Sequence, residues 1–191
     1  MYGKKFQYLK PAVQPRRIAV IGFSGSGKST LAIRLGSILG VPPVHLDSLF
    51  WLPGWRADSR ENMREKLKPE LEKPRWIIEG NYTNVLYDER LNLADTIIMM
   101  DINRFVCFKN CIKRRIMYSK QTRPDMTDGC DEKLDFEFAF WVLCKGRKGR
   151  KSKYEKLSSF SDKNIYIFRS RRQAEKYIKD IKLLKSRNDI K

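Results

Sequence analysis

The chain has 191 residues, of which 41% are apolar, enough for one domain with a buried core. Its formal net charge of +18 favours ligands or partners that carry negative charge, such as nucleotide phosphates, nucleic acid or an acidic membrane surface. Residues 144–191 contain seventeen Lys and Arg against five Asp and Glu, a net +12. A solvated basic surface on an enzyme with polyanionic ligands explains this charge equally well.

Cysteine and histidine usage argues against a structural zinc site. Cys107, Cys111, Cys130 and Cys144 form no C-x-x-C pair, and His45 is the only histidine. Cys107 and Cys111 are one helical turn apart, which predicts small apolar residues on a buried helix face. Free thiols, an N-terminus without the apolar core of a signal peptide, and the absence of a run of ~20 apolar residues predict a cytoplasmic protein.

Apolar runs alternate with helical patterns along the chain, which is typical of an α/β fold with a parallel sheet covered on both faces. The predicted strands are residues 17–23, 43–47, 76–80, 96–101 and 164–170. Asp47 and Asp101 end two of these strands, and a third contains Glu79. Because open parallel sheets bind ligands at the carboxyl ends of their strands, we expect these acids to converge.

The first predicted strand leads into VIGFSGSGKSTL, residues 20–31, which fits the phosphate-loop pattern G-x-x-x-x-G-K-[ST]. Gly25 and Gly27 allow backbone angles that turn successive N–H groups toward an anion, and a helix beginning at Lys28 adds its positive end. Lys28 is placed to reach the β- and γ-phosphates, and Ser29 to contact Mg²⁺. An apolar strand before the loop and an amphipathic helix after it disfavour a chance match.

An aromatic stretch, LDSLFWLPGW at residues 46–55, follows the second predicted strand. Its two tryptophans either pack on the core or form the wall of an acceptor pocket. Asp47 is placed to orient or deprotonate an acceptor, or else it caps a helix or turn. Asn81, in EGNY at residues 79–82, either hydrogen-bonds the same acceptor or caps the next helix.

Further helices are predicted at residues 57–71, 103–120, 135–146 and 171–184. The helix at 103–120 has Phe105, Phe108, Ile112 and Ile116 on its apolar side, and the helix at 135–146 has Phe136, Phe140 and Leu143 spaced for packing. Residues 121–133 lack periodicity and are expected to form a loop. Arg114, Arg115 and Arg123 flank this segment, as a closing lid would require. The charge run at residues 145–153 is expected to be mobile.

The phosphate loop by itself leaves the reaction open. The guanine-specifying N-K-x-D is missing, which argues against a GTPase. Asp101 could hold Mg²⁺ through water, but Ile102 follows it where many ATPases carry a water-activating glutamate, which disfavours a dedicated hydrolase. A small phosphotransferase remains, in which catalysis is mostly positioning and charge neutralisation.

The phosphate loop, LDSLFWLPGW, WIIEGNY, RLNLADTIIMMD, TRPDMTDGC and FEFAFW occur in the same succession as in bacterial DNA topology modulation proteins, relatives of adenylate kinase and shikimate kinase. The resemblance covers about residues 16–180. It implies a P-loop NTPase fold of the nucleoside-monophosphate-kinase type, with three αβα layers and five parallel strands in the order 2-3-1-4-5. We expect a basic extension at residues 1–15 and a single domain at 16–191, with a lid at about 115–135.

Carried over by position, the resemblance implies that Asp47 faces the acceptor and that Arg115 and Arg123 belong to the lid. It also implies that ATP phosphates are bound by Gly22, Ser24, Gly25, Ser26, Gly27, Lys28, Ser29 and Thr30.

Two functions from different classes are open. The first is ATP- and Mg²⁺-dependent phosphoryl transfer to a small nucleotide-like, hydroxyl-bearing or phosphate-bearing metabolite. In it, Lys28 stabilises the transferred group, Ser29 and Asp101 hold the metal, Asp47 serves the acceptor, and lid arginines exclude water. The second is an ATP-binding regulator associated with nucleic acid through its basic C-terminal region, although no helix-turn-helix or zinc-finger pattern occurs. A polynucleotide 5′-kinase lies between them.

Overall fold

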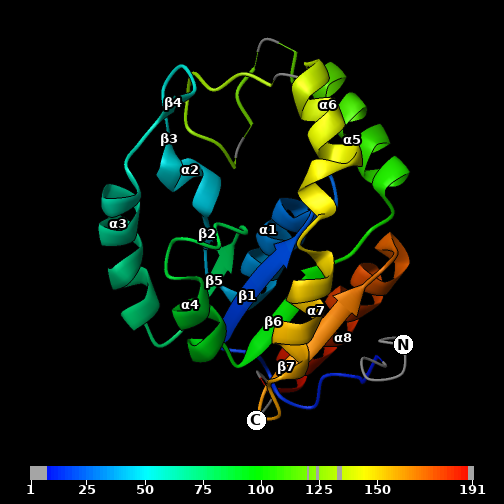
Figure 1. Ribbon diagram of the computed structural model, residues 1–191. Coiled ribbons are helices and arrows are strands. Elements are labelled where there is room, and N and C mark those ends of the chain that lie inside the picture. The colour runs from blue at the N-terminus through cyan, green and yellow to red at the C-terminus, as the bar shows by residue number, and fades with distance from the viewer. Residues whose placement is uncertain (1–7, 120, 124, 133–134, 189–191) are drawn as a thin grey trace.

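A five-stranded parallel sheet in the order β2-β5-β1-β6-β7 forms the centre of the molecule (Figure 1). The computed structural model describes residues 8–119, 121–123, 125–132 and 135–188. The strands of the sheet are β1 (Arg17–Gly22), β2 (Pro43–His45), β5 (Trp76–Glu79), β6 (Thr96–Met100) and β7 (Asn164–Phe168). Counted within this sheet alone, the order is 2-3-1-4-5, so the predicted fold class and strand order are confirmed.

The central strands are apolar along their length because helices cover both faces of the sheet. Successive side chains of a strand point to opposite faces. Ile18 and Val20 therefore enter one layer of the core, whereas Ala19 and Ile21 enter the other. This explains the continuous hydrophobic runs from which the strands were predicted.

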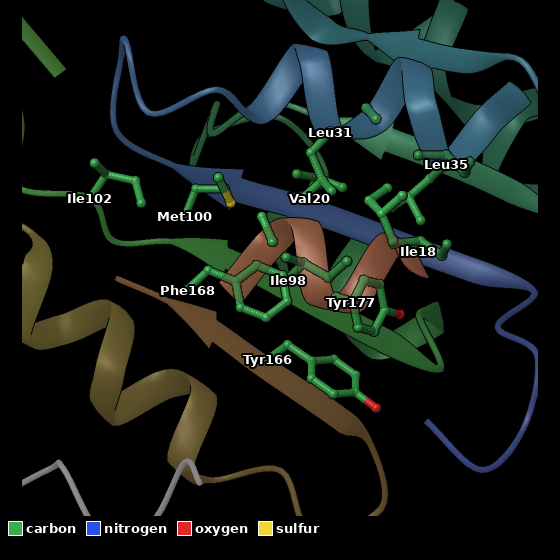
Figure 2. Close-up of a cluster of buried hydrophobic side chains, with 14 of the residues drawn as sticks. Ile18, Val20, Leu31, Leu35, Ile98, Met100, Ile102, Tyr166, Phe168 and Tyr177 are labelled. Carbon is green, nitrogen blue, oxygen red and sulfur yellow. The ribbon is translucent and has the colours of Figure 1, made fainter. Parts of the chain in front are cut away.

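One layer is formed by α1 (Lys28–Leu39) and α8 (Arg171–Asn188). Figure 2 shows Leu31 and Leu35 of α1 on one side of the sheet's apolar side chains, with Tyr177 of α8 close to Phe168. The ring centroids of Tyr177 and Phe168 are 5.6 Å apart. The contacts of Leu31 and Leu35 in this cluster hold α1, which follows the phosphate loop, against β1, which precedes it.

The other layer contains α3 (Arg60–Glu72), α4 (Tyr87–Leu93) and α7 (Arg150–Ser158). Helix α3 begins after Ser59, whose hydroxyl oxygen accepts a hydrogen bond of 3.0 Å from the Asn62 backbone N–H. Met63, Leu67 and Leu71 are buried at every fourth position, as the spacing predicted.

The remaining elements lie beyond the carboxyl ends of the strands (Figure 1). They are α2 (Leu46–Phe50), β3 (Trp51–Leu52), β4 (Arg56–Ala57), α5 (Arg104–Met117), α6 (Phe136–Leu143) and a 3₁₀ helix (Lys145–Arg147). The described residues between α5 and α6 are irregular, as predicted, apart from one bridge between Thr122 and Asp131. No helix in the described ranges has the length and apolar character needed to cross a bilayer.

Helix α5 packs through a face different from the one predicted. Phe105, Ile112 and Ile116 are exposed, whereas Cys107 and Cys111 are buried, as their one-turn spacing predicted. The small thiol side chains allow a close approach to the phosphate loop that larger residues would prevent. In α6, likewise, Phe136 and Phe140 are exposed.

The charge run at residues 145–153 is folded, contrary to the prediction that it is mobile. It forms the 3₁₀ helix and the first turn of α7. Arg150 contributes an ion pair of 2.7 Å to the carboxylate of Asp101, which the sequence pattern did not indicate. Part of the C-terminal positive charge is therefore neutralised inside the fold.

The predicted N-terminal extension packs on the domain where the structure describes it. Residues 1–7, and Pro124 within the predicted lid, lie outside the described residues. The Tyr8 hydroxyl donates a hydrogen bond of 2.5 Å to Asp180 Oδ2 on α8, and its ring centroid lies 6.5 Å from that of Phe168. Pro11 and Pro15 are buried. Residues 8–15 therefore belong to the packed domain.

We expect Tyr8→Phe to lower the free energy of unfolding by about 1–3 kcal/mol, because the buried Asp180 carboxylate loses a hydrogen-bond donor. Urea unfolding followed by circular dichroism measures the change. An unfolding midpoint equal to that of the unmodified chain would contradict the role of residues 8–15 in the core.

Candidate active site

The phosphate-loop pattern forms a strand, a tight loop and a helix, as predicted. Gly25 and Gly27 have φ values of +73° and +90°, in the region that favours glycine, and Gly27 is the N-cap of α1. The N-terminus of α1 and its unpaired backbone N–H groups therefore point into the loop. The Ser26 hydroxyl is buried and has no hydrogen-bond partner among the described residues. An unpaired donor inside a glycine cradle fits an anion such as a phosphate.

Helix α5 packs directly on this loop. A Cβ atom at Gly25 would lie 2.3 Å from the Cys107 carbonyl oxygen and 2.7 Å from Cys111 Sγ. Asn110 Nδ2 donates a hydrogen bond of 2.8 Å to the Gly25 carbonyl. Glycine is required here both for its backbone angle and for its lack of a side chain.

Asn81 ties the start of the loop to the end of β5. Its Nδ2 donates 2.7 Å to the Gly22 carbonyl, and its Oδ1 accepts 3.1 Å from the Gly22 N–H. Both of its side-chain polar atoms are thus used by one residue of the phosphate loop. Neither predicted role, contact with the acceptor or helix capping, describes this geometry.

The carboxylate of Glu79, at the end of β5, lies next to the phosphate loop. Lys28 Nζ lies 3.5 Å from Glu79 Oε1, while the Ser29 hydroxyl donates 3.1 Å to Oε2 and His45 Nδ1 lies 3.1 Å from the same oxygen. Burial alone would raise the pKa of Glu79, but the Lys28 charge and the His45 hydrogen bond outweigh it and hold the pKa below its ordinary value. A buried carboxylate anion therefore lies next to the two residues predicted to serve phosphate and metal.

Asp47 lies in the first turn of α2 and not at a strand end, because β2 stops at His45. Tyr82 donates its hydroxyl to Asp47 Oδ1 at 2.9 Å. Burial raises the pKa of Asp47, the neighbouring Glu79 charge adds to the rise, and Lys28 and the Tyr82 hydrogen bond oppose it. Asp47 is therefore a carboxylate with higher proton affinity than an ordinary aspartate.

A cavity of about 1520 Å³ connects the phosphate loop, Asp47 and the lid. Lys28 and Asp47 both line it. Trp51 and Trp55 form part of its wall, with ring centroids 5.3 Å apart in an edge-to-face arrangement. Both tryptophans therefore line the cavity, and Trp51 also packs against the core cluster in which the neighbouring Phe50 is buried.

Sequence and fold comparisons agree with this geometry. No protein-family model matches the chain. The adenylate kinase of Mycobacterium tuberculosis (strain ATCC 25618 / H37Rv) is 28% identical over 141 residues, 70% of this chain and 70% of the relative. The chain is a P-loop protein similar in sequence to adenylate kinase.

Solved structures of shikimate kinases share the fold of this chain. The enzyme from Acinetobacter baumannii, in complex with shikimate, aligns with a TM-score of 0.58 at 17% identity, covering 92% of this chain and 96% of that one. The enzyme from Bacteroides thetaiotaomicron aligns with a TM-score of 0.53 at 20% identity, covering 89% and 98%. These relatives support the adenylate kinase and shikimate kinase part of the resemblance. The relation to DNA topology modulation proteins stays a prediction.

Arg60, at the start of α3, is a cavity residue that the sequence did not single out. Its guanidinium carbon lies 4.4 Å from the ring centroid of Phe50 and 5.4 Å from that of Tyr82. No carboxylate among the described residues lies within ion-pair distance of it. Only the fold brings this cation to the cavity that Asp47 lines, because twelve residues, including the β3–β4 hairpin, lie between them in the sequence.

The lid arginines are placed differently from the prediction. Arg115 is exposed and is not among the residues that line the cavity, so its catalytic role stays a prediction. Arg114 lines the cavity instead, because one residue along a helix turns the side chain by roughly 100°. Arg123 lines the cavity as expected, but it already pairs with Asp125 at 2.9 Å and with Glu132.

Asp101 is not placed to hold a metal with Ser29. Its carboxylate accepts hydrogen bonds from Arg150 at 2.7 Å and from the Tyr154 hydroxyl at 2.6 Å, and it does not line the cavity. Ser29 contacts Glu79 instead. The geometry therefore contradicts the predicted metal role of Asp101 and assigns it to the attachment of α7.

We expect Asp101→Asn to lower the free energy of unfolding of the protein by about 1–3 kcal/mol while leaving its Mg²⁺-dependent affinity for ADP within twofold. The charge that holds Arg150 is lost, but the phosphate loop is untouched. Urea unfolding and calorimetric titration with ADP measure the two effects. A large loss of Mg²⁺-dependent affinity with unchanged stability would restore the metal role.

Proposed function

We propose that the protein transfers the γ-phosphoryl group of ATP, in the presence of Mg²⁺, to a small acceptor that carries a hydroxyl or phosphate group. The observation that carries this proposal is that Lys28 and Asp47 line the same cavity, and that the buried Glu79 carboxylate acts on both of them. The similarity to adenylate kinase supports nucleotide-dependent transfer in general.

The phosphate end of the cavity is built by the chain between Gly22 and Thr30. The backbone N–H groups of this loop and the unpaired Ser26 hydroxyl would hold the phosphates, and Lys28 would neutralise charge on the transferred group. The Ser29 hydroxyl and the Glu79 carboxylate are the groups that would hold Mg²⁺. One or two protein ligands are enough, since Mg²⁺ in kinases takes further ligands from phosphates and water. Bound there, the metal supplies neutralisation of phosphate charge.

Asp47 serves the acceptor. It would accept the proton that an acceptor hydroxyl loses as its oxygen bonds to phosphorus. Its raised pKa suits this role because a more basic carboxylate takes a proton more readily. Tyr82 fixes the orientation of the carboxylate through the hydrogen bond to Oδ1.

The acceptor pocket combines aromatic walls with a cation. Trp51 and Trp55 offer flat apolar surface, and Arg60 offers a guanidinium without a carboxylate partner in the described part of the chain. An acceptor that carries a carboxylate or phosphate in addition to its reacting hydroxyl fits these groups, since arginine binds both anions in bidentate fashion. Nucleotides and hydroxy acids both meet this description.

Lys28→Ala is expected to lower phosphoryl transfer by about 100-fold to 1,000-fold, since it removes a fixed positive charge from the transferred group. ATP consumption with Mg²⁺ measures the effect, with the protein alone, with pools of nucleosides, nucleotides and hydroxy acids, and with duplex DNA. Lys68→Ala, at an exposed position on α3, is the matched control and should retain full activity. Undiminished transfer by Lys28→Ala would overturn the proposal, and consumption stimulated by DNA alone would favour the nucleic-acid function.

Transfer should also fall on the acid side of its pH profile at a higher pH than for an ordinary aspartate, because the pKa of Asp47 is raised and its ionised form is needed. Glu79, Lys28, Tyr82 and Arg123 are the titratable and charged groups that act on it. Tyr82→Phe removes a hydrogen bond that lowers this pKa, so the acid limb of kcat should move to still higher pH. An acid limb that stays in place or moves to lower pH would remove Asp47 from the acceptor role.

A further inference from the structure

The loop after β5, residues 80–86, has an unusual backbone. Gly80 has a φ of +138°, and the non-glycine residues Tyr82 and Leu86 have φ values of +28° and +45°. Side chains with a Cβ atom rarely adopt such angles. They persist where the surrounding structure holds them, and they cluster at functional sites.

The side chain of Arg90, in α4, binds this loop through hydrogen bonds to backbone carbonyl groups. Its guanidinium donates to the carbonyl oxygens of Gly80 at 3.0 Å, Asn81 at 2.7 Å and Tyr82 at 3.2 Å, and its Nε donates to Leu86 at 3.3 Å. The residue is fully buried, with no exposed surface. No ion pair to it occurs in the described ranges, so its charge is compensated by loop carbonyls.

Two side chains of this loop make hydrogen bonds to residues at the two ends of the cavity, and we call these contacts the two branches. Asn81 makes the reciprocal pair with the Gly22 backbone, at the start of the phosphate loop. Tyr82 donates to Asp47, on the acceptor side. The carbonyl groups of both residues are bound by the same Arg90 nitrogen, Nη2.

We propose that Arg90 is a positioning residue that fixes the phosphate loop relative to the acceptor carboxylate through the loop at residues 80–86. Arg90 does not line the cavity, so it acts through Asn81 and Tyr82 and touches no ligand. This inference rests on the proposed function in its catalytic part.

A purely space-filling role does not explain the choice of residue. Burial of a guanidinium without a carboxylate is costly, and an apolar side chain would fill the same volume without that cost. Burial lowers the pKa of Arg90 to about 10, so the group is still a cation at neutral pH. What the planar fork of donors adds is a fixed spacing between three successive carbonyl groups.

The test compares Arg90→Lys, Asn81→Ala and Tyr82→Phe, with Leu91→Val as the control at a neighbouring buried position outside this network. Affinity for ADP is measured by calorimetry, kcat and KM by ATP consumption, and protection of residues 80–86 by hydrogen exchange.

Arg90→Lys should weaken ADP binding by about 10-fold, lower kcat by about 10-fold to 100-fold, and increase exchange in the loop. Asn81→Ala should reproduce mainly the loss of ADP affinity, and Tyr82→Phe mainly the loss of kcat. Leu91→Val should change neither quantity.

ADP affinity and kcat of Arg90→Lys equal to those of Leu91→Val would overturn the inference. If Arg90→Lys does not fold, the double variant Asn81→Ala, Tyr82→Phe decides: strictly additive losses would show that the branches are independent and overturn it, whereas non-additive losses support it. If the unmodified protein transfers no phosphoryl group, the proposed function fails, but ADP affinity and loop exchange still decide the positioning role.

Discussion

The ionised carboxylate of Glu79, buried at the end of β5, is the constraint on which the site depends. The parallel register of the sheet pairs Glu79 with Val20 of β1 on one side and with His45 of β2 on the other. A buried charge is tolerated only with partners, and these come from separate parts of the chain: Lys28 and Ser29 from α1, and His45 from β2. The pairing that makes the burial possible also holds the lysine and hydroxyl of the phosphate loop in place.

A second carboxylate, Asp47, lies near this one and behaves in the opposite way. Burial raises the pKa of Asp47 and the Glu79 charge adds to the rise, while Lys28 and His45 outweigh the burial of Glu79 and lower its pKa. Two acids with diverging proton affinities can take different roles in one reaction. In the proposed reaction, Glu79 would stay ionised beside the phosphates, and Asp47 would exchange a proton with the acceptor.

The sequence was sufficient for features that depend on neighbouring residues. The phosphate loop, the five strands and the order of the sheet follow from local patterns and from one resemblance over most of the chain. Side-chain direction was harder to predict: Arg115 and Arg114 differ by one position, yet only Arg114 faces the cavity. Asp101 was placed at the right strand end, but its partner Arg150 is 49 residues away, in a segment that looked like a mobile charge run. Arg60 belongs to no sequence motif. Folding alone brings the rings of Phe50 and Tyr82 next to its guanidinium, so a sequence pattern could not have identified it.

The distribution of the four tryptophans gives the molecule built-in optical reporters. Trp51 and Trp55 line the cavity from β3 and the turn after it, and Trp141 lines it from α6, stacked on Phe138 with ring centroids 6.2 Å apart. Trp76 is buried in the core, away from the cavity, and contributes a constant background. Intrinsic fluorescence of a Trp141→Phe variant therefore reports on the cavity wall that contains Trp51 and Trp55, and that of a Trp51→Phe, Trp55→Phe variant reports on the wall formed by α6, without any attached dye.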